Sequence, residues 1–331
     1  MEVNNSFDII PMLSIHPTKL NLYSQIQWHK KRPYRSKRFN ISMASKDHAG
    51  KVSVHAKRKI SKAIEYLLFL SREKELPDTY NGRNYKFRLA FITLTLPSKQ
   101  VHSDQEIKEQ CLNQFLIEAR KKWNVKNYLW RAEKQKNGNI HFHILVDKFI
   151  PWSVLRDSWN RIINKLDYVS NYRDEMRRFH DGGFKVRQDL IKQWDYKSQI
   201  KAYNSQKVKD WNSPNSTDIH SVHKVKNIQA YVSKYCTKDE QNAGLKGRLW
   251  GCNEALSNVP GAQLVIDSEV NDALISLFNK YNPRSYVGAH FTSISIEFAM
   301  LNDSDSDLLF NAFTTFLQNH FGTNYQKQLF T

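Results

Sequence analysis

The chain of 331 residues has only three cysteines, Cys111, Cys236 and Cys252, and they are widely spaced. An odd number of cysteines without a CxxC pair offers no framework for a structural metal and indicates a reducing cytoplasm. The longest apolar run, Tyr66–Leu70, is far too short to span a bilayer. An apolar N-terminal segment with a small-residue cleavage site is also missing, so no secretory signal is expected.

Acidic residues are scarce, with 32 Asp and Glu against 50 Lys and Arg and a formal net charge of +18. Such a balance implies a polyanionic partner, either nucleic acid or an anionic membrane surface, and the short apolar runs disfavour the membrane. From Leu256 onward the balance reverses to three basic and seven acidic residues, so the first 255 residues carry +22. We therefore expect the polyanion to bind in the first three quarters of the chain.

The patterns of apolar residues predict an α+β fold, a central antiparallel sheet with flanking helices, and 40% hydrophobic residues suffice for a core. Strands are expected at 87–97, 126–134, 140–147, 183–188, 218–223 and 290–298. Helices are expected at 55–74, 103–123, 151–166, from 227 and at 304–320. Residues 190–216 are polar and unpatterned, which predicts an inserted loop with some helix.

Three segments are expected: a basic N-terminal arm (1–54), a central domain (55–255) and an acidic C-terminal α+β extension (256–331). The arm contains "HKKRPYRSKR", with six basic residues in ten. Its candidate DNA contacts are Lys30, Lys31, Arg32, Arg35, Lys37 and Arg38. A solvated arm without such contacts is the alternative, because both use the same charges.

The segment "RAEKQKNGNIHFHILVD" carries the first candidate chemistry. Side chains alternate along a strand, so His141 and His143 share one face while Phe142 faces the core. Two imidazoles on one face are good ligands for a divalent cation, although an exposed strand face is the alternative. Glu133 would be the third ligand. One carboxylate and two imidazoles leave positions free for water and phosphate oxygen, which suits Mg²⁺ or Mn²⁺.

The loop between the two strands decides whether Glu133 reaches the histidines. A two-residue Asn137-Gly138 loop would pair Lys134 with His141 and turn Glu133 to the wrong face. A three-residue loop with Gly138 in the left-handed conformation, or any odd loop, puts Glu133 across from a histidine. We therefore predict an odd loop.

The octet "YVSKYCTK" carries two tyrosines, each followed by a lysine three positions later. On a helical wheel at about 100° per residue, Val232 and Cys236 lie on an apolar stripe. Tyr231, Lys234, Tyr235 and Lys238 share a separate arc about 100° wide. A phenol needs a nearby cation to become a nucleophile at neutral pH, and a lysine one turn away supplies it or neutralises a phosphate. A solvated Tyr/Lys face is the alternative.

Together these motifs resemble the HUH endonuclease superfamily, specifically the two-tyrosine replication initiators of microvirus-like rolling-circle phages and bacterial plasmids. The matching pieces, in order, are "FITLTLP", "HFH" and "YVSKYCTK", and "GRLWG" (Gly247–Gly251) resembles a segment that follows the tyrosines. The tyrosines follow the histidines, unlike in conjugative relaxases. A Walker A sequence is absent, so the helicase domain of eukaryotic-virus initiators is missing.

The resemblance implies an RRM-like nuclease core over residues 55–255. It also implies a metal-dependent initiator that nicks and joins single-stranded or hairpin origin DNA through a 5′-phosphotyrosine and frees a 3′-OH primer. Tyr231 and Tyr235, helped by Lys234 and Lys238, would act on a phosphate held at Glu133, His141 and His143. Arg248 joins the expected DNA contacts. A host helicase and polymerase in a bacterial cytoplasm would complete replication.

Two alternatives stay open at this point. A basic single-stranded nucleic-acid-binding protein without enzyme activity would have the same composition and charge. A two-tyrosine transposase would share the chemistry, but it often carries a cysteine-rich zinc module, which three scattered cysteines cannot form. The pair His220 and His223 falls on opposite faces of its strand, so we assign it a structural role.

Overall fold

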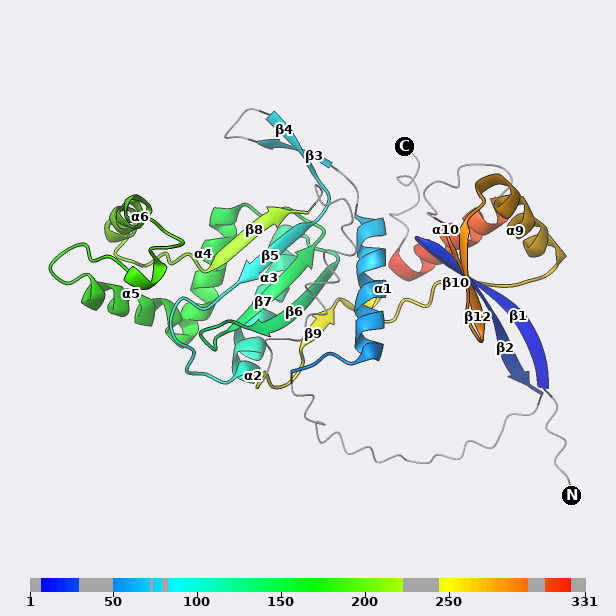
Figure 1. Ribbon diagram of the computed structural model, residues 1–331, viewed down its shortest axis with the longest axis horizontal. Helices are drawn as coiled ribbons and strands as arrows, with labels where there is room; N and C mark the ends of the chain where they lie inside the picture. Colours follow the sequence, from blue (N-terminus) through cyan, green and yellow to red (C-terminus); the bar gives the residue numbers. More distant parts are fainter. Residues whose placement is uncertain are drawn as a thin grey trace, which may run out of the picture. The chain divides into compact units, whose positions relative to one another are not determined.

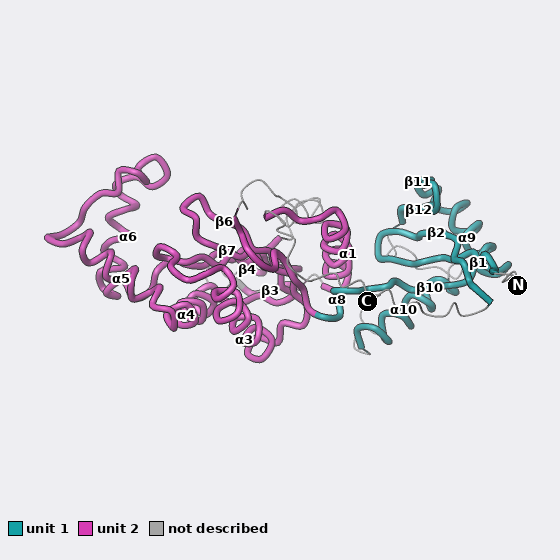
Figure 2. Tube along the Cα trace, turned by 90° about the horizontal axis from the view of Figure 1, so that it is seen from below, with its two compact units in different colours: residues 1–44, 254–331 teal, residues 45–253 magenta. Residues whose placement is uncertain are grey.

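The computed structural model describes residues 7–29, 50–71, 74–78, 83–222, 244–296 and 307–322. The chain forms two compact units (Figure 2). One unit comprises residues 45–253, and the other combines residues 1–44 with 254–331. The octet "YVSKYCTK" and the basic cluster from Lys30 to Arg38 lie outside the described residues.

The unit of residues 45–253 is built on a five-stranded antiparallel sheet (Figure 1). In spatial order the strands are β8 (Thr217–Ser221), β5 (Ala90–Leu94), β7 (Ile140–Val146), β6 (Tyr128–Lys134) and β9 (Trp250–Cys252). The expected α+β class and the central antiparallel sheet with flanking helices are confirmed. Four of the five strands coincide with strands predicted from the sequence.

Helices α3 (Asn113–Trp123) and α4 (Trp152–Ile163) cover one face of this sheet. Phe142 of β7 is fully buried there, and its ring centroid lies 6.3 Å from that of Trp159 in α4. Trp159 also packs edge-on against Phe115 of α3. Since side chains alternate along a strand, this contact turns His141 and His143 to the opposite face.

The remaining helical turns follow local capping signals. Helix α1 (Val54–Leu70) begins where the Ser53 hydroxyl accepts a hydrogen bond from the Ala56 N–H. The predicted helix 103–123 begins at α2 (Asp104–Glu106) with a complete capping box between Ser103 and Glu106. It continues through the π-helical turn η1 (Ile107–Leu112) into α3.

The predicted strand at 183–188 is wrong. Gly182 and Gly183 have φ values of 80° and 124°, so the chain turns here and residues 183–187 pair with no strand. The Arg187 N–H donates to the side chain of Gln199, in place of a neighbouring strand. The sequence analysis also missed helix α5 (Tyr168–Phe179), which follows turn η2 (Asn164–Leu166). Within residues 190–216 the helix is α6 (Tyr196–Val208), which follows turn η3 (Gln188–Leu190).

The second unit contains another five-stranded antiparallel sheet. Its strands, in spatial order, are β10 (Ala262–Val265), β1 (Phe7–His16), β2 (Lys19–Trp28), β12 (Phe291–Ser295) and β11 (Arg284–Val287). Its helices are α8 (Glu254–Ser257), α9 (Ser268–Tyr281) and α10 (Asp307–Phe321). Strand β12 and helix α10 lie within the predicted elements at 290–298 and 304–320.

The N-terminal boundary differs from the predicted one. Residues 1–54 were expected to form a basic arm, but Phe7–Trp28 form a hairpin that pairs with strands of the C-terminal segment. Leu13, Ile15 and Leu20 are fully buried there, and their spacing of two residues turns one hairpin face toward the core. A small hairpin, β3 (Lys74–Asp78) with β4 (Arg83–Phe87), precedes β5. No helix within the described ranges is long and apolar enough to cross a membrane.

Candidate metal centre

The β6–β7 hairpin has the odd loop that the sequence analysis predicted. The Gln135 N–H donates to the Asn139 carbonyl at 2.8 Å, which closes a three-residue loop of Lys136, Asn137 and Gly138. Gly138 has φ 84°, in the left-handed region that favours glycine. The loop therefore pairs Glu133 with His141, and both side chains point to the same face.

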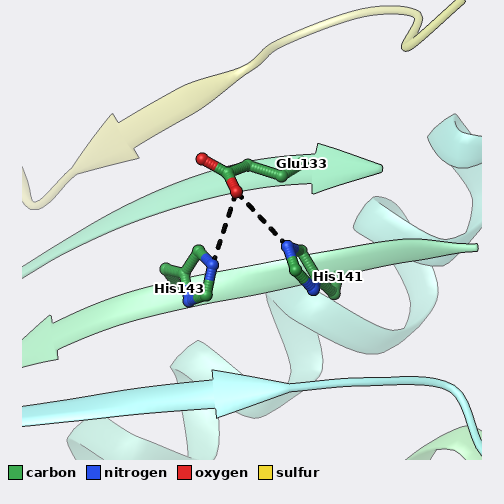
Figure 3. A group of neighbouring side chains, drawn as sticks. All are labelled: Glu133, His141 and His143. Carbon is green, nitrogen blue, oxygen red and sulfur yellow. Dashed lines mark hydrogen bonds and ion pairs between the residues drawn. The ribbon is translucent and has the colours of Figure 1, made fainter. Parts of the chain in front are cut away.

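Glu133, His141 and His143 converge on that face (Figure 3). The Oε2 atom of Glu133 lies 3.4 Å from Nε2 of His141 and 3.4 Å from Nε2 of His143. One candidate ligand atom from each residue lies within 4.8 Å of the others. Ligand atoms about 2.1 Å from a shared ion lie roughly 3–4 Å apart, so only a small contraction would bring these three onto one cation.

The electrostatics of Glu133 suit a cation. Burial disfavours its charged form, but hydrogen bonds from both histidines and their charges outweigh burial and lower the pKa of Glu133 to about 2. Its Oε1 atom is buried and has no hydrogen-bond partner within the described part of the chain. A buried carboxylate oxygen without a donor is costly, and a bound cation would satisfy it. The residues present therefore fit a divalent metal ion.

Thr93 of β5 orients the second histidine, a role that the sequence analysis missed. Thr93 pairs directly with His143, and its Oγ1 lies 3.1 Å from His143 Nδ1. When Nδ1 carries the proton and donates it to this hydroxyl, Nε2 keeps the lone pair that a metal needs. The phenyl ring of Phe91 lies 5.2 Å from the same imidazole. The sequence signal was available, because Thr93 and Phe91 alternate within the predicted strand.

Arg131 also lies on the face of the triad and was not singled out from the sequence. It pairs with His143 and precedes Glu133 by two residues, which puts both side chains on one face of β6. It is among the largest fully buried side chains of the described ranges. A positive charge therefore lies on the same sheet face as the candidate ligands.

The structure places one expected DNA contact away from the triad. Arg248 is exposed, its Nε donates to the Trp250 carbonyl, and its guanidinium lies 6.0 Å from the Trp130 ring. Trp130 alternates with Arg131 along β6, so the ring faces away from Glu133. The other six expected DNA contacts, both tyrosines and both lysines of the octet lie outside the described residues.

The Gly247–Gly251 segment leads into the edge strand β9. Gly251 pairs with Trp130, and a Cβ atom at Gly251 would lie 2.8 Å from the indole nitrogen of Trp130. Only glycine allows the strand to approach this ring so closely. His220 of β8 stacks at a tilt against Phe91, and His223 lies outside the described residues.

Fold and site together define an α+β protein with a candidate metal centre on one face of an antiparallel sheet. Residues 89–240 match the family model of the replication-associated protein ORF2. The matched segment contains Thr93, the metal-ligand triad and the octet "YVSKYCTK", and the match is consistent with a rolling-circle replication initiator. No curated protein and no solved structure matches the chain.

Proposed function

We propose that this protein initiates rolling-circle DNA replication as a metal-dependent HUH-type endonuclease and strand transferase. It would nick single-stranded or hairpin origin DNA and rejoin it. The observation that carries the proposal is the convergence of Glu133, His141 and His143 within the segment similar to replication-associated proteins. The net charge of +18 supports a nucleic-acid substrate.

Glu133, His141 and His143 would hold Mg²⁺ or Mn²⁺ through one oxygen and two ring nitrogens. When bound, such an ion supplies Lewis-acid stabilisation of negative charge on a phosphate oxygen. The Thr93 hydroxyl keeps His143 in the tautomer whose Nε2 faces the site. These side chains are 13–16% exposed, which shields their charges from solvent screening while leaving an approach to the face.

Tyr231 and Tyr235 are the proposed nucleophiles. The phenolate oxygen of one tyrosine forms a bond to the scissile phosphorus as the bond to the 3′ oxygen breaks. The 3′ oxygen takes a proton and becomes the primer hydroxyl, while the 5′ phosphate stays joined to the tyrosine. Lys234 and Lys238 would stabilise the phenolate or the phosphate charge.

Two tyrosines allow two successive transfers on one protein. The second tyrosine would cleave the regenerated origin, and the newly freed 3′-OH would attack the first phosphotyrosine and reseal the strand. Each tyrosine has a lysine three positions later, so the sequence makes both equally suited to begin.

The partners follow from this chemistry. A host helicase would unwind the duplex and a host polymerase would extend the 3′-OH in the bacterial cytoplasm. The basic residues Lys30, Lys31, Arg32, Arg35, Lys37, Arg38 and Arg248 are the proposed contacts to the DNA backbone.

The experiment is incubation with labelled single-stranded origin DNA and Mn²⁺, followed by a denaturing gel. We expect a covalent protein–DNA adduct that EDTA abolishes and that both His141→Ala and the double variant Tyr231→Phe, Tyr235→Phe abolish. The matched controls His55→Gln and Tyr286→Phe replace exposed side chains and should form the adduct normally. Binding of the origin strand without an adduct would instead support a non-enzymatic nucleic-acid-binding protein.

A further inference from the structure

A small aromatic cavity lies between helices α5 and α6, in the segment of residues 168–211, which we call the α5–α6 excursion. The cavity has a volume of about 270 Å³. This is slightly below the size of pockets that take drug-sized ligands, about 300–1,000 Å³. Its volume suits one small planar group.

Aromatic rings form the walls of the cavity. Phe184, Tyr203, Trp211 and His180 all line it. The Tyr203 ring centroid lies 5.4 Å from that of Phe184 and 6.0 Å from that of Trp211. The imidazole of His180 is nearly parallel to both Phe184 and Trp211, with interplanar angles of 15° and 14°. Parallel and tilted rings around a gap offer π faces, on which nucleobases stack.

One polar group in the cavity lacks a partner. Gln206 lines the cavity, and its Oε1 atom is buried without a hydrogen-bond partner in the part of the chain that the structure describes. The neighbouring Gln199 differs, because its side chain both accepts from the Arg187 N–H and donates to backbone carbonyls. A buried carbonyl oxygen that lacks a donor is costly, so Gln206 is suited to accept an N–H from a ligand.

The charge around the cavity favours a polyanionic ligand. The excursion contains ten Lys and Arg against six Asp and Glu. Lys185 and Arg187 line the cavity itself, and Arg187 also forms an ion pair with Asp189. Phosphates beside a stacked base would meet these cations.

The cavity is tied to the strand that supports the metal centre. Pro97 lines the cavity and follows Thr93 by four residues, so their Cα atoms lie at most about 15 Å apart. The chain after the excursion is fixed to the same segment, because the Thr95 N–H donates to the Ser216 carbonyl at 2.8 Å. Asn160 of α4 donates to the Pro214 carbonyl at 3.1 Å. A few nucleotides of single strand can span this distance.

We infer that this cavity receives one unpaired nucleobase of single-stranded DNA near the scissile phosphate. Phe184, Tyr203 and Trp211 contact the base, and Gln206 Oε1 accepts a hydrogen bond from an N–H at its edge. The inference rests on the proposed function in taking single-stranded DNA as the ligand. It adds a base-binding site that the metal centre and the tyrosines do not supply.

The test compares two fluorescent probes of equal length, an oligothymidylate and its abasic counterpart, by fluorescence anisotropy in EDTA. Both carry the same phosphates, so the ratio of their affinities reports contacts to bases alone. We expect Gln206→Met to reduce that ratio about two- to tenfold. Phe184→Ala should reduce it about fivefold or more. The control Val208→Thr, at a side chain that is 89% exposed and outside the cavity, should keep the wild-type ratio.

The Gln206→Met variant keeps the test decisive if Phe184→Ala unfolds the excursion. Methionine has a similar shape and removes an unsatisfied oxygen, so the fold should keep or gain stability in a thermal melt. A wild-type affinity ratio in folded Gln206→Met, or an equal loss for both probes, would overturn the inference. Because the assay contains no metal and no origin sequence, failure of the nicking reaction would leave its outcome unchanged.

Discussion

Glu133 lies directly opposite His141 in the β6–β7 hairpin, and its Oε2 lies 3.4 Å from the His141 Nε2. This relationship depends on the three-residue loop, because a slip by one residue would turn Glu133 to the helix-covered face. The hairpin loop therefore assembles the candidate metal centre. The predictions below test the ligands, the residue that orients one of them, the loop and the helices behind the sheet.

Replacing Glu133 with glutamine should lower Mn²⁺ affinity by at least about tenfold, measured by isothermal titration calorimetry. The amide keeps the size of the side chain but removes the charge that the cation needs. Mutation of groups that only support metal ligands already costs about 10–100-fold in affinity, so loss of a ligand should cost no less. The exposed residue Glu269 provides the control Glu269→Gln, and equal affinities of both variants would contradict the assignment.

The hydroxyl of Thr93 should matter through His143. Thr93→Val keeps the branched shape and removes the group 3.1 Å from His143 Nδ1, so Mn²⁺ affinity should fall about 10–100-fold. Thr93→Ser restores the hydroxyl and should recover most of the affinity. If valine and serine variants bind Mn²⁺ equally well, the hydroxyl does not orient the histidine.

The loop residue Gly138 should resist substitution by alanine. A Cβ atom would have open space around it, so the cost comes from φ 84° alone. We expect Gly138→Ala to lower the free energy of unfolding by about 1–2 kcal/mol in urea titration. Gly138→Asn should cost less, since asparagine tolerates the left-handed region. Lys136→Ala, at an exposed position of the same loop, should change stability by less than about 0.5 kcal/mol, and an equal loss there would argue against backbone strain.

Glu118 of α3 should make stability depend on pH. Burial opposes its charge, but hydrogen bonds from Lys122, Arg161 and Gln114 hold its pKa at about 2. Arg161 belongs to α4, so this contact joins the two helices behind the sheet. A lowered pKa in the folded state stabilises the protein above the ordinary carboxyl pKa, and that stabilisation disappears as pH falls toward 2.

Glu118→Gln should therefore lower the free energy of unfolding by about 1–3 kcal/mol at pH 7. The difference between wild type and variant should shrink as pH falls from about 4.5 toward 2, measured by urea titration at each pH. A difference that stays constant across this range would show that the carboxylate charge does not contribute.

Local patterns predicted the metal centre because each of its determinants is short-range. Strand alternation fixed the faces of His141 and His143, and an Asn-Gly turn signal located the hairpin. The loop length followed from requiring Glu133 to reach the histidines, and the structure confirms it. Thr93 was missed because its contact depends on the pairing of β5 with β7, which lie about 50 residues apart in sequence.

Long-range pairing also explains the errors in the fold. Strands β1 and β2 show alternation, but they acquire their neighbours from β10 and β12 near the other end of the chain. A basic cluster after Trp28 favoured reading the whole N-terminal region as an arm. The segment 183–188 has strand-like composition, yet two preceding glycines with positive φ and the Gln199 side chain give it a different backbone.

The most direct test of the central claim is mass spectrometry of the trypsin-digested protein–DNA adduct. Cleavage after Lys234 separates Tyr231, in residues 227–234, from Tyr235, in residues 235–238. The account predicts a nucleotide attached through a phosphotyrosine bond to one or both of these peptides, formed with Mn²⁺ and absent in EDTA. A covalent nucleotide on any other residue, or origin cleavage without a protein-linked nucleotide, would contradict it.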